Sequence, residues 1–131
     1  GTRYYSPVLV ELIAPRSLAE LGWIALALIP AVLLEELLFR SLLVGGLTPI
    51  LPPALLVLMA ALLFGLMHTP QGSWGVVGAT AAGVLFGTLF LAVGSLLLPL
   101  AAHYVTNVVQ LAIALRQRRV EEREQAAERT E

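Results

Sequence analysis

The chain has 131 residues, of which 58% are hydrophobic and only 13% are charged, and its formal net charge is −1. Soluble domains are usually about 45–50% apolar and about 25% charged, so this composition excludes an ordinary water-soluble fold and favours one surrounded by lipid. Every charge is Arg or Glu, without the basic face that nucleic acid would need, and the chain has no cysteine for a disulfide or a thiolate metal site.

The N-terminal region precedes the first long hydrophobic stretch. Residues 1–16 are predicted to form an interfacial segment, because Tyr4 and Tyr5 are suited to the headgroup level of a membrane. Because the chain begins at Gly1 rather than at a methionine, we expect it to be the C-terminal portion of a longer protein.

The first long helix is predicted over residues 18–44. Ser17 and Glu20 form the pattern of a capping box at its start, and two glycines at 45–46 end it. The stretch is long enough to cross a bilayer, which needs roughly 20 apolar residues. Pro30 lies inside it and is expected to kink the helix.

Three further hydrophobic helices are predicted, over residues 54–68, 74–93 and 96–119 or beyond. The second is short for a span, and the third is rich in Gly and Ala, which permit close helix packing in lipid. The sequence therefore predicts an all-α, multi-pass bundle of about four transmembrane helices.

The charges at the two ends predict the topology. Residues 17–116 form the membrane core, and residues 117–131 form a charged tail that is helical or disordered. An even number of spans, four, places the Arg residues before the first span and those after the last span on the same side of the membrane. The positive-inside rule makes that side cytoplasmic in the cell membrane. The basic residues concerned are Arg3, Arg16, Arg116, Arg118 and Arg119.

Three ionisable residues lie close together in the first predicted span, at Glu35, Glu36 and Arg40. A charge at mid-bilayer costs about 2.5–3.5 kcal/mol on insertion scales, so these side chains must face protein or water. Glu36 and Arg40 are one helix turn apart and are predicted to form a supporting ion pair. Glu35 points about 100° away from Glu36, and no basic residue remains in the spans to pair with it.

The later spans contain two histidines. His68 ends the second helix, with Phe64 one turn before it and predicted to pack beside the imidazole in a supporting role, and His103 shares a helix face with Asn107. Each alone has a structural explanation, as an interhelical hydrogen bond. A carboxylate, two imidazoles and a carboxamide from three helices together favour a functional site, since intramembrane ionisable residues usually mark function.

The three polar patterns resemble the motifs of one family, the CAAX proteases and bacteriocin-processing enzymes, also called the ABI or CPBP family. Its motifs are Glu-Glu-x-x-x-Arg, Phe-x-x-x-His and His-x-x-x-Asn, and this chain is similar to the type II CAAX prenyl endopeptidases in having all three in order, at residues 35–40, 64–68 and 103–107. The resemblance covers roughly residues 20–115, and family members usually have more helices before the first motif.

The resemblance implies an intramembrane endopeptidase that hydrolyses a peptide bond of a membrane-associated or lipidated substrate. Glu35 and His68 would activate a water, and His103 and Asn107 would stabilise the oxyanion. No cofactor is expected, although Glu35, His68 and His103 would equally suit zinc. The expected partners are membrane lipid and a peptide or protein substrate, with no nucleic acid, and the oligomeric state stays open.

Two other functions remain open at the level of sequence. One is a bacteriocin self-immunity or scaffold protein with an inactive site. The other is a small proton-coupled transporter that uses Glu35 and His68 as a relay, although a transport path needs polar residues across both leaflets and here they cluster at one level.

Overall fold

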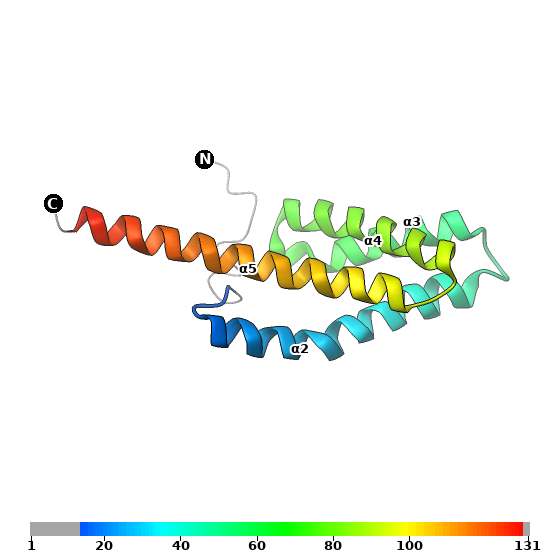
Figure 1. The fold of residues 1–131 in the computed structure, drawn as a ribbon. Helices are drawn as coiled ribbons and strands as arrows, with labels where there is room; N and C mark the ends of the chain where they lie inside the picture. The colour runs from blue at the N-terminus through cyan, green and yellow to red at the C-terminus, as the bar shows by residue number, and fades with distance from the viewer. Residues whose placement is uncertain (1–13, 130–131) are drawn as a thin grey trace.

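A computed structural model of the chain describes residues 14–129. Within that range the chain forms long antiparallel helices that run back and forth (Figure 1). The predicted interfacial segment, with Tyr4 and Tyr5, falls mostly outside the described residues. The elements in chain order are α2 (Leu18–Glu36), η1 (Leu37–Gly45), α3 (Pro53–Met67), η2 (Thr69–Gln71), α4 (Ser73–Val93) and α5 (Leu97–Glu128).

The start of α2 follows the predicted capping pattern. The Ser17 hydroxyl accepts a hydrogen bond from the backbone N–H of Glu20 at 3.1 Å, and the Glu20 carboxylate accepts one from the N–H of Arg16 at 2.8 Å. Two donors that a helix leaves unpaired at its N-terminus are thereby satisfied. The helix continues through Pro30 and is visibly bent along its length (Figure 1), as a proline within a helix predicts.

The second half of the predicted first helix differs from an α-helix. The chain is π-helical from Leu37 to Gly45, directly after α2. Periodicity did not predict this change, because a continuous apolar stretch fits either geometry. Short π segments within α-helices frequently occur at functional sites, and this one follows Glu36 and carries Arg40.

Helices α3 and α4 pack closely through small residues. A Cβ atom added to Gly83 would lie 2.9 Å from the Cα of Ala61, and one added to Gly87 would lie 3.0 Å from a methyl of Val57. Larger residues at these positions would push the two helices apart. The expectation that the glycine-rich helix allows close packing is met at this interface.

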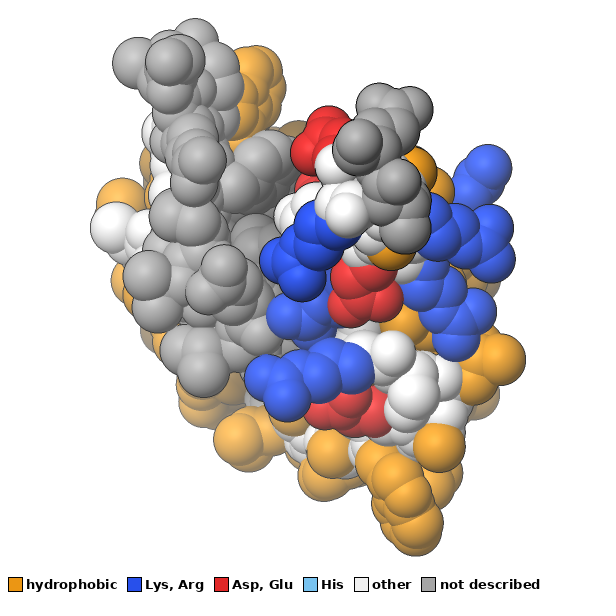
Figure 2. Space-filling view, turned by 90° about the vertical axis from the view of Figure 1, so that its left-hand side faces the viewer, with side chains coloured by type: hydrophobic (Ala, Val, Ile, Leu, Met, Phe, Trp, Pro, Cys, Tyr) orange, Lys and Arg blue, Asp and Glu red, His pale blue; other side chains and the backbone are white. Residues whose placement is uncertain are grey.

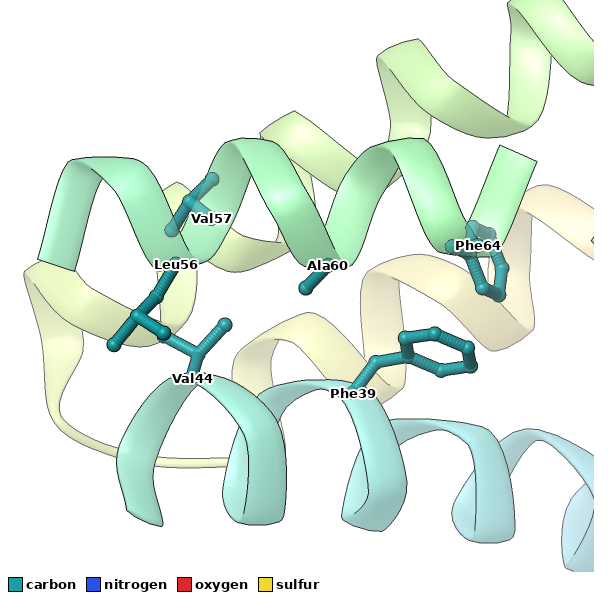
Figure 3. Close-up of a cluster of buried hydrophobic side chains, with 6 residues drawn as sticks. All are labelled: Phe39, Val44, Leu56, Val57, Ala60 and Phe64. Atoms are coloured by element: carbon teal, nitrogen blue, oxygen red, sulfur yellow. The ribbon is translucent and has the colours of Figure 1, made fainter. Parts of the chain in front are cut away.

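A cluster of buried hydrophobic side chains lies between η1 and α3 (Figure 3). Two of its members come from η1 and four from α3, and the rings of Phe39 and Phe64 meet edge to face with centroids 5.1 Å apart. The cluster consists of Phe39, Val44, Leu56, Val57, Ala60 and Phe64. It holds the first and second motifs together, because Phe39 and Phe64 belong to them.

Among residues 14–129, three stretches are long and apolar enough to cross a membrane, namely 18–45, 73–93 and the stretch that starts α5, while α3 is a shorter apolar helix. Many large apolar side chains point outward from the bundle, including Trp23 and Leu97, which are about three quarters exposed. These features make the chain a membrane protein with a helical bundle of about four helices, as the composition predicts.

The residues just before α2 and the charged part of α5 lie on the same side of the bundle (Figure 1). The Arg118 guanidinium in α5 donates a hydrogen bond to the Ala14 carbonyl just before α2, at 2.9 Å. Arg and Glu side chains gather at this end, with hydrophobic side chains around them (Figure 2). The helix α5 continues as far as Glu128, so most of the charged tail is helical.

Candidate active site

The first and third motifs meet in the interior of the bundle. The Nδ1–H of His103 in α5 donates to the Glu36 carboxylate at 2.7 Å, and Arg40 lies 3.0 Å from the same oxygen of Glu36. All three side chains are almost completely buried. The predicted Glu36–Arg40 pair is therefore present, but it extends across the bundle to His103, which helix spacing alone did not reveal.

Glu35 also approaches His103, from the other side of the imidazole. Its Oε2 lies 3.5 Å from Nε2 of His103, and its side chain is 36% exposed. The expectation that Glu35 has no basic partner among the spans is thus wrong, because it counted only Arg and Lys. Of the two adjacent carboxylates, Glu36 is enclosed and Glu35 remains accessible.

His68 is oriented by its own helix. Its Nδ1 lies 2.7 Å from the Phe64 carbonyl, and since a carbonyl can only accept, Nδ1 carries the hydrogen. The Nε2 atom is then left with a lone pair. His68 lies at the end of α3, just before the 3-10 turn η2, and is half-buried.

The Phe64 ring connects the two histidines. Its centroid lies 4.5 Å from that of His68 and 5.6 Å from that of His103, which it meets edge-on. The predicted supporting role of Phe64 beside His68 is consistent with this contact, and the proximity to His103 adds a second one. His68 is therefore linked to the other polar residues through an aromatic ring.

An aromatic enclosure surrounds Arg40 and His103, and one of its members was not predicted. The Arg40 guanidinium lies 5.0 Å from the centroid of Phe64 and 5.3 Å from that of Phe86, and 6.0 Å from Phe39. Phe86 also stacks on His103, with centroids 5.1 Å apart and planes at 22°. Phe86 lies in α4 next to Gly87, on the face that packs inward, but no polar pattern marks it.

Asn107 follows His103 by one turn of α5 and is half-buried. Its side chain makes no hydrogen bond to the residues that the structure describes, so its amide is available to another group. Tyr104, which sequence reasoning did not single out, ties the same stretch of α5 to α2, since its hydroxyl donates to the Ala25 carbonyl at 3.0 Å.

Several buried polar atoms of the cluster lack hydrogen-bond partners among residues 14–129. These atoms are Oε2 of Glu36 and both terminal nitrogens of Arg40. The Arg40–Glu36 pair is close enough for an ion pair but is not aligned as a hydrogen bond. The charges thus stabilise one another mainly by proximity in apolar surroundings, where such attraction is strong.

The described residues include no group of three or more His, Cys, Asp or Glu side chains arranged to hold a metal ion. The alternative zinc set of Glu35, His68 and His103 does not meet that arrangement. Both ring nitrogens of His103 face carboxylates, and Nδ1 of His68 faces a carbonyl.

Comparison with known proteins identifies a family. The model of the family described as type II CAAX prenyl endopeptidase Rce1-like matches residues 17–109, a stretch that contains all three motifs. No curated protein and no solved structure shows a significant match.

Proposed function

The chain belongs to the type II CAAX prenyl endopeptidase Rce1-like family, and from this premise we propose that it hydrolyses a peptide bond of a membrane-associated or lipidated substrate with Glu35 as the central catalytic residue. Family membership makes it a CAAX-type intramembrane protease at the level of the family. The assignment of roles to residues and the choice of substrate form our proposal.

One observation carries the proposal: an accessible carboxylate touches a buried imidazole inside an apolar bundle, with Glu35 Oε2 3.5 Å from His103 Nε2. Ionisable groups at membrane depth are costly and usually serve function. Glu36 is paired and fully enclosed, so Glu35 is the carboxylate that a water or substrate can reach.

In the proposed reaction, Glu35 and His68 activate a water for attack on the scissile carbonyl. Glu35 accepts the proton of the attacking water, and His68 orients that water through the lone pair of Nε2. The attack forms a C–O bond and places negative charge on the carbonyl oxygen. The proton held by Glu35 then goes to the departing amine as the C–N bond breaks.

His103 and Asn107 are proposed to stabilise the oxyanion. In this proposal His103, which lies between two carboxylates, carries a hydrogen on both ring nitrogens: Nδ1–H donates to Glu36, and Nε2–H, on the side of Glu35, is left to donate to the oxyanion. The Asn107 amide makes no hydrogen bond within residues 14–129 and lies one helix turn away, so it can supply a second donor. Preorganised donors of this kind contribute most where water is excluded.

The test is cleavage of a prenylated peptide that ends in a CAAX sequence, by the full chain in proteoliposomes. Glu35→Gln keeps the size of the side chain but removes the base, so we expect cleavage to fall by about 10²-fold or more. Glu121→Gln, which alters an exposed carboxylate in the charged tail, is the matched control and should leave cleavage unchanged. Wild-type rates in Glu35→Gln would contradict the proposal, and equal cleavage of the unprenylated peptide would remove the lipid from the proposed substrate.

We propose that the reaction uses these side chains without a metal ion. The support is the donor arrangement, in which the imidazole nitrogens of His103 already face carboxylates. Metal analysis of the purified protein, with cleavage measured after chelation and after readdition of zinc, tests this point. Stoichiometric zinc whose removal abolishes cleavage and whose return restores it would contradict the metal-free mechanism.

We propose further that the protein lies in the cell membrane with its C-terminal tail in the cytoplasm. The support is that Arg118 contacts the segment before α2, so the basic residues near both ends lie on one side. The positive-inside rule then assigns that side to the cytoplasm.

A further inference from the structure

Beside the edge-on contact with Phe64 and the approach of Glu35, two closer contacts restrain the imidazole of His103. The Glu36 carboxylate accepts a hydrogen bond from Nδ1 at 2.7 Å, and an imidazole N–H points along the plane of its ring. The Phe86 ring covers one face of the imidazole, with centroids 5.1 Å apart and planes only 22° from parallel. The carboxylate restricts rotation of the ring within its plane, and the phenyl ring restricts its tilt.

Arg40 connects these two contacts. Its guanidinium lies 3.0 Å from the Glu36 oxygen that His103 uses and 5.3 Å from the centroid of Phe86. Each of the four residues is at most 3% exposed. Arg40 thus contacts both of the residues that restrain His103, namely Glu36 through its charge and Phe86 through a cation–π contact.

We propose that Phe86, with Glu36, is a positioning residue that directs Nε2 of His103 toward the reacting groups. This inference rests on the proposed function, in which that atom stabilises the oxyanion. Both side chains are almost completely buried, so in this proposal neither contacts the substrate. Phe86 comes from α4, which contains none of the three motifs. Through Phe86, α4 also contributes a side chain to the site.

The physical consequence is specific. Without the Phe86 ring, the in-plane bond to Glu36 persists but the imidazole can tilt about it, so Nε2 moves relative to Glu35. A displacement of about 1 Å from a productive geometry can cost about 10²-fold in rate. Because neither residue is proposed to contact the substrate, substrate binding is expected to be much less affected.

The test uses Phe86→Leu in the full chain, with Phe90→Leu as the matched control. Phe90 lies one turn further along α4, is partly buried, and packs against Gly45. The chain has only two histidines, so selective ¹⁵N-histidine labelling gives two imidazoles to follow by NMR. A His68→Ala spectrum assigns them.

We expect Phe86→Leu to move the ring signals of His103, which lose the ring current of the stacked phenyl, and to leave those of His68 nearly in place. The kcat for peptide cleavage should fall by 10-fold or more with KM within about threefold. Glu36→Gln should move the Nδ1 signal of His103, and Phe90→Leu should change neither the spectrum of His103 nor kcat.

Unchanged His103 signals in Phe86→Leu would overturn the proposal, and so would moved signals with an unchanged kcat. If circular dichroism shows that Phe86→Leu does not fold, Phe86→Met supplies the same test with an unbranched apolar side chain. Absence of any cleavage by the wild-type chain would reject the proposed function instead, while the NMR comparison would still decide whether Phe86 orients His103.

Discussion

At the scale of single residues, the buried cluster depends on the balance of its charges. Glu36 and Arg40 are almost inaccessible and surrounded by aromatic rings. Buried ion pairs are costly to desolvate, but removal of one partner costs more, because the remaining charge is left uncompensated. The cluster therefore tolerates paired changes better than single ones.

The corresponding prediction concerns Arg40→Met. This substitution leaves the Glu36 carboxylate without its cation and should destabilise the bundle by about 3–5 kcal/mol, whereas the double variant Glu36→Gln/Arg40→Met should lose distinctly less. Denaturant unfolding in mild detergent measures the difference. Arg119→Met, at an exposed position of α5, is the control and should stay within about 0.5 kcal/mol of wild type. A single variant as stable as wild type would show that the charge of Arg40 is dispensable for folding.

At the scale of helices, the contact between α3 and α4 separates glycines that packing requires from glycines that it does not. A Cβ at Gly83 would lie 2.9 Å from the backbone of Ala61, whereas a Cβ at Gly78 would meet nothing within 4 Å. Both residues lie in α4, so the intrinsic effect of replacing glycine in a helix is shared. The difference in stability between variants at these two positions therefore measures the effect of the close contact between α3 and α4.

We accordingly predict opposite outcomes for two alanine substitutions. Gly83→Ala should destabilise the bundle by about 1–3 kcal/mol, because the added methyl meets backbone atoms that cannot rotate away. Gly78→Ala should be neutral or stabilising by up to about 1 kcal/mol. Unfolding midpoints of the two variants, measured side by side, provide the comparison. Equal effects would mean that α3 and α4 are not in close contact through Gly83.

The π-helical segment also acts at this scale. In an α-helix, residues five apart point about 140° from each other, so Phe39 and Val44 would face different ways. The wider π turn pairs residues five apart and brings these side chains closer to alignment. Both are buried in the same cluster against α3 (Figure 3), and Arg40 lies in the same segment.

At the scale of the whole molecule, the helices alternate in direction, so the start of α2 and the end of α5 lie at the same end of the bundle (Figure 1). The opposite end contains the apolar turn between η1 and α3, where Ile50 is 74% exposed. Arg and Glu side chains therefore lie at one end of the bundle. The turns at the other end, between η1 and α3 and between α4 and α5, contain no charged residue. By the positive-inside rule, the end with the Arg residues is expected to face the cytoplasm.

The orientation can be measured directly, because the chain has no cysteine of its own. We predict that Ile50→Cys reacts with a membrane-impermeant maleimide in intact cells and that Gln125→Cys reacts only after permeabilisation. The two single-cysteine variants serve as controls for each other, since they lie at opposite ends of the bundle. The reverse labelling pattern would place the tail outside the cytoplasm.

The sequence by itself determined the elements and their membrane character. Apolar length, breakers and the capping pattern at Ser17 predicted the bounds of α3 and α4 within one residue, and likewise those of α2 and η1 taken together, although not the change from α- to π-helix at Leu37. Spacing along one helix predicted the Glu36–Arg40 pair, because neighbours one turn apart are set by helix geometry alone. The three motifs predicted the family, while the catalytic roles of Glu35, His68, His103 and Asn107 stay predictions.

Only the tertiary structure decided which side chains meet between helices. The bond from His103 to Glu36 joins residues 67 positions apart, and the stacking of Phe86 joins α4 to α5. Helical periodicity gives the faces of each helix but not the rotation of one helix against another, which depends on the packing of all of them. The π geometry of η1 was hidden for a related reason, because burial against α3 favours it and the apolar run of residues is equally compatible with an α-helix.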